Sequence, residues 1–99
     1  MRERSAEMRT ERVDQRPDEM VQGVAYLLPN GVLLFVCPCG CEQGKLQLTM
    51  IPTQKLEGYG ADWPMSSENP LTISPSILRL SLDCQSHYFI TDGKIQWCL

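Results

Sequence analysis

Thiol and imidazole side chains gather in two short segments of this 99-residue chain. Four of the five cysteines and the single histidine lie in Cys37-Pro38-Cys39-Gly40-Cys41 and Cys84-Gln85-Ser86-His87. Structural zinc takes four such ligands in a tetrahedron, usually four cysteines or three cysteines and a histidine, supplied by separate parts of the chain. The two segments therefore predict the two halves of one metal site.

This donor set has one member too many for a tetrahedral ion. The candidate ligands are Cys37, Cys39, Cys41, Cys84 and His87. The first three can converge on one ion only if the chain bends, and Gly40 is the residue that best permits a bend. Sequence does not choose which candidate is left out, nor does it choose between one zinc ion and iron.

The cysteine count also bears on the compartment. Five cysteines are an odd number, and the chain opens with alternating arginines and glutamates rather than with an apolar export segment. Both features indicate a reducing, cytoplasmic compartment, in which clustered cysteines hold metals. Cys98 lies apart from the cluster in an apolar segment and is expected to be a buried free thiol.

Charge and hydropathy exclude two classes of partner. The net charge is −3 and the isoelectric point is near 5, so nothing attracts the chain generally to nucleic acid. The longest apolar run, residues 31–37, has the length of a strand and is too short to span a bilayer. A protein partner remains the natural expectation.

Residues 1–20 differ in composition from the rest of the chain. Five arginines and six carboxylates stand among few apolar residues, and Glu3, Glu7 and Glu11 recur every four residues. This spacing suits a solvated helix with side-chain ion pairs, and Pro17 would end it. The block is therefore predicted to be a charged helical or disordered arm, followed by a metal-binding β domain over residues 21–99.

Period-two patterns and turn signals predict an all-β fold built from hairpins over residues 21–99. Two hairpins are expected, one with strands 21–28 and 32–36 around a Pro-Asn-Gly turn and one with strands 87–90 and 94–98 around an Asp-Gly turn. Residues 45–51 form a further expected strand, in which Leu46, Leu48 and Met50 are on the apolar side. Short strands are expected at 71–74 and 77–82, on either side of Pro75. Residues 52–70 are expected to form a long loop that Trp63 anchors in the core. The expected product is a small zinc-stabilised β-sheet or barrel.

Several of these motifs together resemble a family of small uncharacterised bacterial proteins. The CPCGC segment, Trp63, Pro75-Ser76-Ile77, Cys84-x-Ser86-His87-Tyr88-Phe89-Ile90, Gly93 and Trp97 follow its CPCGC, W, PSI, CxSHFWI, G, W pattern over about residues 21–99. The resemblance implies zinc binding. Some members are encoded beside activating-enzyme-like, conjugating-enzyme-like, ubiquitin-like and JAB-type peptidase genes, which implies an accessory role in a ubiquitin-like conjugation or antiphage system with one of those proteins as partner.

A second resemblance, to Rieske-type domains, concerns the fold alone. Those domains carry their metal-binding loops at the tips of a small β structure, as the two cysteine segments are expected to lie here. A Rieske iron needs two histidines, and this chain has one. The expected architecture is thus Rieske-like or zinc-ribbon-like, with zinc in place of the cluster.

These features favour a non-enzymatic zinc protein that binds a protein partner, and no catalytic residue is predicted. Serine-histidine chemistry would need His87, which the metal site is expected to take, and Glu42 and Asp83 are expected to be solvated or to support the ligands. Two alternatives stay open. One is an iron-sulfur or rubredoxin-like electron-transfer protein, and the other is a metal-dependent or thiol-dependent enzyme.

Overall fold

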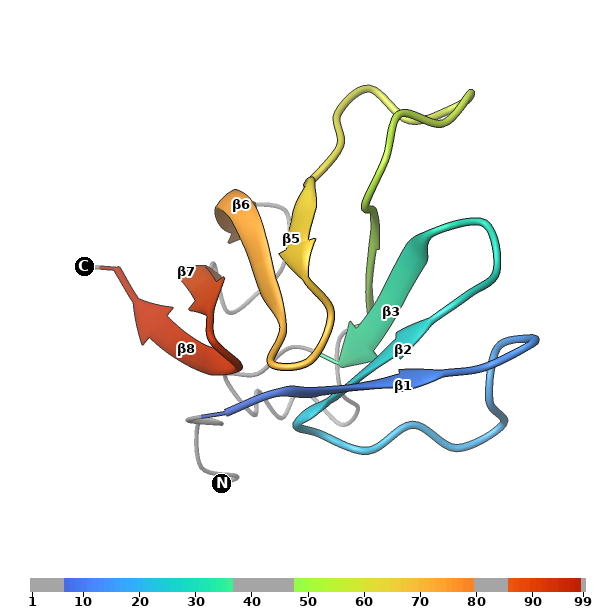
Figure 1. The fold of residues 1–99 in the computed structure, drawn as a ribbon, viewed down its shortest axis with the longest axis horizontal. Helices are drawn as coiled ribbons and strands as arrows, with labels where there is room; N and C mark the ends of the chain where they lie inside the picture. Colours follow the sequence, from blue (N-terminus) through green and yellow to red (C-terminus); the bar gives the residue numbers. More distant parts are fainter. Residues whose placement is uncertain (1–6, 37–47, 80–85, 99) are drawn as a thin grey trace.

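The chain folds into two small β-sheets in a computed structural model that describes residues 7–36, 48–79 and 86–98 (Figure 1). These residues form eight strands and no helix. The strands are β1 (Arg9–Arg12), β2 (Val24–Leu27), β3 (Val32–Val36), β4 (Leu48–Pro52), β5 (Met65–Ser67), β6 (Thr72–Arg79), β7 (Ser86–Thr91) and β8 (Lys94–Trp97). The predicted all-β class is confirmed. No helix able to cross a membrane occurs in the described ranges.

The first sheet has the strand order β1-β2-β3-β4, with β1 parallel to β2 and the other neighbours antiparallel. Its β2–β3 hairpin is the one predicted from Pro29-Asn30-Gly31. The turn closes with Leu28 N–H donating to Val32 O at 2.9 Å, and Gly31 takes a φ of +94°, which a side chain would strain.

The second sheet has the order β5-β6-β7-β8 and is antiparallel throughout. Its last two strands form the predicted closing hairpin. Asp92 and Gly93 lie between them with φ values of 52° and 74°. Two positive φ values in succession match the right-handed twist of the flanking strands, which is why Asp-Gly is a strong hairpin signal.

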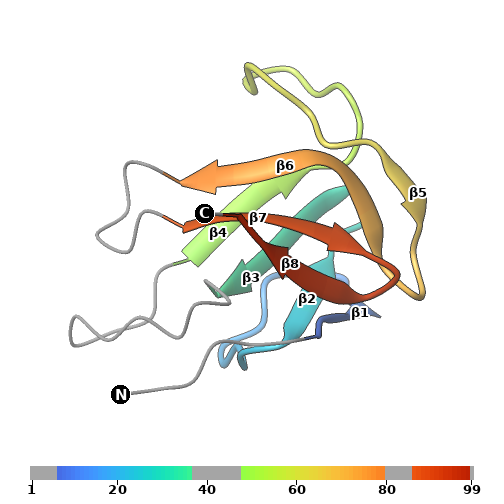
Figure 2. The same cartoon turned by 90° about the vertical axis from the view of Figure 1, so that its left-hand side faces the viewer.

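One apolar layer holds the two sheets together. The second sheet lies in front of the first in Figure 2, and the side chains between them form the main core. Ala25, Leu27, Leu33, Phe35 and Ile51 come from the first sheet, and Leu71, Ile73, Ile77, Tyr88, Ile90 and Ile95 come from β6 to β8 and the residue before β6. Neither sheet has this core without the other.

The outer face of the first sheet is covered as well. Val24, Tyr26, Val32 and Leu34 form a second cluster, against which Val13, Met20, Leu28 and Leu56 pack. The connection between β1 and β2 supplies two of these covering residues. Because both faces are covered, β2 and β3 are buried at every position and have continuous rather than alternating apolar sequences.

The prediction of a helix or disorder is wrong for residues 9–12, which form β1. Arg9, Thr10, Glu11 and Arg12 pair in register with β2, and only Thr10 among them is buried. Met8 is also buried in the main core, and its N–H donates to Gly93 O at 2.7 Å. The buried residues Met8 and Thr10 are two positions apart, which is the spacing of one face of a strand. The recurrence of glutamates every four residues suggested a helix instead.

The predicted faces of β4 are reversed. Thr49 and Ile51 are buried, whereas Met50 is 45% exposed. The cause is register: Thr49 pairs with Phe35 and Ile51 with Leu33, and both partners belong to the main core. Side chains of directly opposed residues share one face of a sheet, so tertiary pairing overrode the local pattern.

Two further predictions on the second sheet need correction. Residues 52–70 contain a strand, β5, and residues 72–79 form one strand where two were expected on either side of Pro75. The expected anchoring of Trp63 is confirmed, because its half-buried side chain packs against the main core. Pro75 marks an irregularity inside β6 rather than its end.

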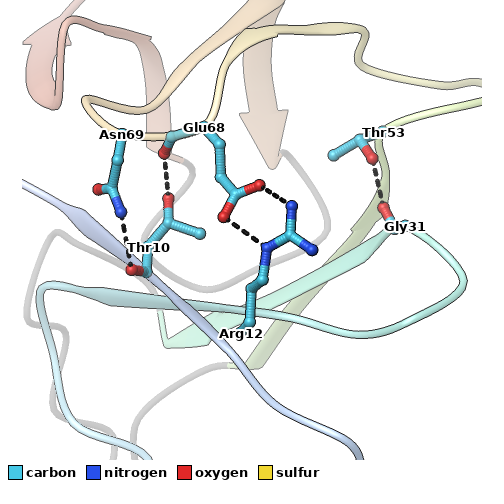
Figure 3. A network of polar contacts seen from close by, with 6 residues as sticks. All are labelled: Thr10, Arg12, Gly31, Thr53, Glu68 and Asn69. Atoms are coloured by element: carbon cyan, nitrogen blue, oxygen red, sulfur yellow. Dashed lines mark hydrogen bonds and ion pairs between the residues drawn. The ribbon is translucent and has the colours of Figure 1, made fainter.

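Polar contacts join β1 to the segment that follows β5 (Figure 3). Thr10 Oγ1 donates to Glu68 O at 2.7 Å, and Arg12 donates through Nε and Nη2 to the two carboxylate oxygens of Glu68 at 2.8 and 2.6 Å. Asn69 Nδ2 donates to Thr10 O at 3.4 Å. Since β1 lies in the first sheet and β5 in the second, these bonds tie the edges of the two sheets.

We predict that Thr49→Val stabilises the protein by about 1 kcal/mol, because a buried hydroxyl without a partner costs desolvation and valine has nearly the same shape. Thr49 is fully buried, and its Oγ1 finds no hydrogen-bond partner among the described residues. Thr10→Val is the matched control. It removes a made bond and should destabilise by about 1 kcal/mol. Urea unfolding measures both, and a Thr49→Val protein less stable than wild type would contradict the assignment.

We predict a pH-dependent loss of stability for Glu68→Gln. The hydrogen bond from Arg12, followed by its charge, lowers the pKa of Glu68 despite an opposing contribution from desolvation. A lowered folded-state pKa stabilises the fold above the ordinary glutamate pKa, and this contribution disappears as pH falls through the lowered value. Wild type should therefore be slightly more stable than Glu68→Gln at neutral pH and equal to it in acid. Thermal melts across pH test this, and a constant difference would refute it.

Candidate active site

A serine and a histidine meet on adjacent strands of the second sheet. Ser76 Oγ of β6 lies 2.8 Å from Nε2 of His87 of β7, and both residues are half-buried. This distance is that of a hydrogen bond between a hydroxyl and a ring nitrogen. It is also the spacing at which a histidine accepts the proton of a serine nucleophile.

The packing of the main core orients the side chains of Ser76 and His87 away from the interior. Ile77 pairs with Tyr88, and both are fully buried in the main core. Successive side chains of a strand point to opposite faces, so their neighbours Ser76 and His87 lie on the opposite face of the sheet. Phe89 is 40% exposed between two buried neighbours, and its ring centroid lies 6.4 Å from that of His87.

An irregularity in β6 brings Ser76 within reach of His87. Ile73 pairs with Ile90 and Ile77 with Tyr88, so three residues of β6, Ser74 to Ser76, face the single residue Phe89 of β7. Such a bulge bends the strand locally and redirects the side chains it carries. Bulges are common beside active sites for this reason.

The pair has the groups needed for nucleophilic catalysis. When the imidazole is neutral with its proton on Nδ1, Nε2 accepts a hydrogen bond from the serine hydroxyl and can take its proton during attack on a carbonyl. Among the described residues, Ser76 is the one hydrogen-bond partner of the His87 ring. The described part of the site is thus a serine-histidine pair rather than a complete triad.

Backbone or side-chain bonds from two other segments reach the backbone of the pair. From the segment before β5, Trp63 Nε1 donates to Ser76 O at 3.3 Å. Beyond β8, Cys98 N–H donates to His87 O at 2.9 Å, which places Cys98 directly across from His87. Cys98 is a free cysteine of intermediate exposure rather than the buried thiol expected from the sequence.

Most of the predicted metal ligands lie outside the described residues. These are Cys37, Cys39, Cys41 and Cys84, and the flanking carboxylates Glu42 and Asp83 lie there too. His87 is the one candidate ligand that the structure describes, and it contacts Ser76. Within the described ranges, no group of three or more metal-binding side chains comes together.

Two hollows among the described residues lie away from this pair. The larger, of about 970 Å³, is lined by Arg12, Leu28, Gln54, Met65 and Glu68 among others, and the smaller, of about 480 Å³, by Met8, Gly23, Pro70 and Lys94 among others. Neither Ser76 nor His87 lines either one. Ser76 and His87 are half-buried on the face of the second sheet opposite the main core.

A family model matches residues 12–98, and its description is bacterial ubiquitination-like system serine protease, BubE. The chain therefore belongs to the BubE family. This membership confirms the expected link to a bacterial ubiquitin-like system and is consistent with protein partners from that system. No curated protein and no solved structure matches the chain.

Sequence reasoning missed Ser76. The available signal was Pro75, because a proline inside an apolar strand pattern marks a bulge or an edge, and a serine follows it directly. What the sequence could not supply was the register of β6 against β7, which brings Ser76 to His87 across eleven positions of the chain.

Proposed function

We propose that this chain is a serine protease of a bacterial ubiquitination-like system, with Ser76 as nucleophile and His87 as general base. The observation that carries the proposal is the 2.8 Å contact between Ser76 Oγ and His87 Nε2, in a family described as serine proteases. The proposal replaces the non-enzymatic role that the cysteine segments favoured.

The chemistry follows the usual course of acyl transfer. Ser76 Oγ attacks the carbonyl carbon of a peptide bond while His87 Nε2 takes the hydroxyl proton, and His87 then returns that proton to the leaving amine as the carbon–nitrogen bond breaks. Water, activated by the same histidine, hydrolyses the acyl-serine. The proposed substrate class is a protein of the conjugation system, in line with the description of the family.

Assigning His87 to Ser76 also resolves the surplus of metal ligands. Five candidates compete for four places, and removing His87 leaves Cys37, Cys39, Cys41 and Cys84. Four thiolates make a closed structural zinc site, which stabilises a small fold and leaves no open position for catalysis. We therefore propose one structural zinc ion held by these cysteines, beside a catalytic pair that does not use it.

Ser76→Ala is predicted to abolish labelling by a fluorophosphonate, a reagent that phosphorylates activated serines. In this reaction the Ser76 oxygen–phosphorus bond forms, fluoride leaves, and His87 takes the proton. His87→Gln should slow labelling by about 10²-fold or more, because general-base assistance contributes on that order. The readout is intact mass spectrometry over time.

Two variants serve as controls for the labelling experiment. Ser74→Ala removes an exposed serine of the same bulge, and Cys98→Ser removes the thiol next to His87. Both should be labelled like wild type. Labelling that persists in Ser76→Ala, or that Cys98→Ser removes, would overturn the assignment of Ser76.

The zinc proposal predicts about one zinc per chain in purified protein, measured by inductively coupled plasma mass spectrometry. Cys84→Ser should lower zinc content and stability, whereas His87→Gln should keep both. Loss of zinc in His87→Gln would show that the histidine is a ligand. Iron with visible absorbance would favour the redox alternative. A folded wild-type protein without bound metal would refute the zinc proposal.

A further inference from the structure

The β6 bulge is held from its outer side by the segment that enters β5. Ser74 N–H donates to Pro64 O at 3.2 Å, and Trp63 Nε1 donates to Ser76 O at 3.3 Å. These two bonds flank Pro75, the centre of the bulge. Two adjacent residues, Trp63 and Pro64, thus hold both ends of the segment that carries Ser76.

The bulge needs this external support because β7 cannot give it a full ladder. Three residues of β6 face Phe89 alone, and Pro75 has no N–H to donate. Fewer sheet bonds leave the peptide groups of the bulge free to rotate. The orientation of the Ser76 carbonyl is coupled through the backbone to the direction in which its side chain leaves the Cα atom.

Trp63 is itself anchored firmly enough to act as a support. Its backbone N–H donates to Pro52 O at 2.8 Å at the end of β4, and its half-buried ring packs against the main core. Trp63 is thus tied to the first sheet through its backbone and to the second sheet through its indole N–H, which is a donor with no acceptor function.

We propose that Trp63 is a positioning residue for the nucleophile: its indole N–H holds the Ser76 carbonyl and so keeps Ser76 Oγ on His87 Nε2. This inference rests on the proposed function and adds to it a residue that does not touch the substrate. Misplacement of a reacting group by a fraction of its contact distance reduces the rate of the chemical step far more than binding of the substrate.

The sharpest test removes one donor and nothing else. Benzothienylalanine at position 63, introduced by site-specific incorporation, keeps the size and shape of the indole but has sulfur in place of the N–H. Fluorophosphonate labelling of the full chain at several reagent concentrations gives a limiting rate, kinact, and a binding constant, KI. The isostere should lower kinact by about 10-fold or more with KI unchanged.

Genetic variants support the same comparison. Trp63→Phe should also lower kinact, and Trp63→His, which keeps a ring N–H, should recover part of the loss. Trp97→Phe is the matched control, because Trp97 is another half-buried tryptophan that packs against the main core, at 5.2 Å from the Tyr88 ring. It should leave kinact within about twofold of wild type, since small shifts away from the reacting atoms cost little.

The outcomes separate this inference from the proposed function. If wild type is labelled at Ser76 and the isostere has an unchanged kinact, Trp63 does not position the nucleophile, although Ser76 remains the reactive serine. If wild type is not labelled, or is labelled elsewhere, the proposed function and this inference both fail. A fall in kinact that Trp97→Phe reproduces would show general loosening of the core and would also overturn the inference.

Discussion

The apolar layer between the two sheets determines where every other side chain points. Tyr88, Ile77 and Ile90 are fully buried in it, and each fixes the face of its neighbours along the strand. His87 and Ser76 must then lie on the opposite face, and Phe89 is exposed for the same reason. Core residues thus determine the positions of His87 and Ser76, because a one-residue slip would turn the histidine inward and bury the polar nitrogens of its ring.

Strict alternation makes Ser76 and His87 diagonal neighbours on one face, and the bulge adjusts how they approach each other. In a regular ladder, Ser76 would oppose Phe89, and His87, which opposes Leu78, would lie two positions further along. The extra residues of β6 bend the strand so that the hydroxyl reaches Nε2. The bonds from Trp63 and Pro64 then limit this local freedom. The site therefore combines a regular strand that carries His87 with an irregular, externally held segment that carries Ser76.

Local sequence signals predicted the elements that local physics determines. Pro29-Asn30-Gly31 and Asp92-Gly93 need positive φ values at their glycines, and the hairpins around them formed as predicted. Elements that depend on distant partners were missed or misassigned. The strand Arg9–Arg12 exists because β2 pairs with it, Met50 faces outward because Thr49 pairs with Phe35, and Ser76 meets His87 through a register that no local pattern specifies. The resemblance to a family near ubiquitin-like genes predicted the right system without revealing the contact between Ser76 and His87.

His87 could serve either the proposed serine chemistry or the proposed zinc site, and chemistry explains why the histidine suits only the first. A general base must exchange a proton at Nε2 in each turnover, which requires a ring whose basicity is left intact. A zinc ion on the other nitrogen would withdraw electron density from the ring and make Nε2 a poorer proton acceptor. Four cysteines can close a tetrahedral site without the ring. In the sequence, Cys84 comes two residues before β7 begins at Ser86, so a zinc site that includes Cys84 would be close along the chain to His87.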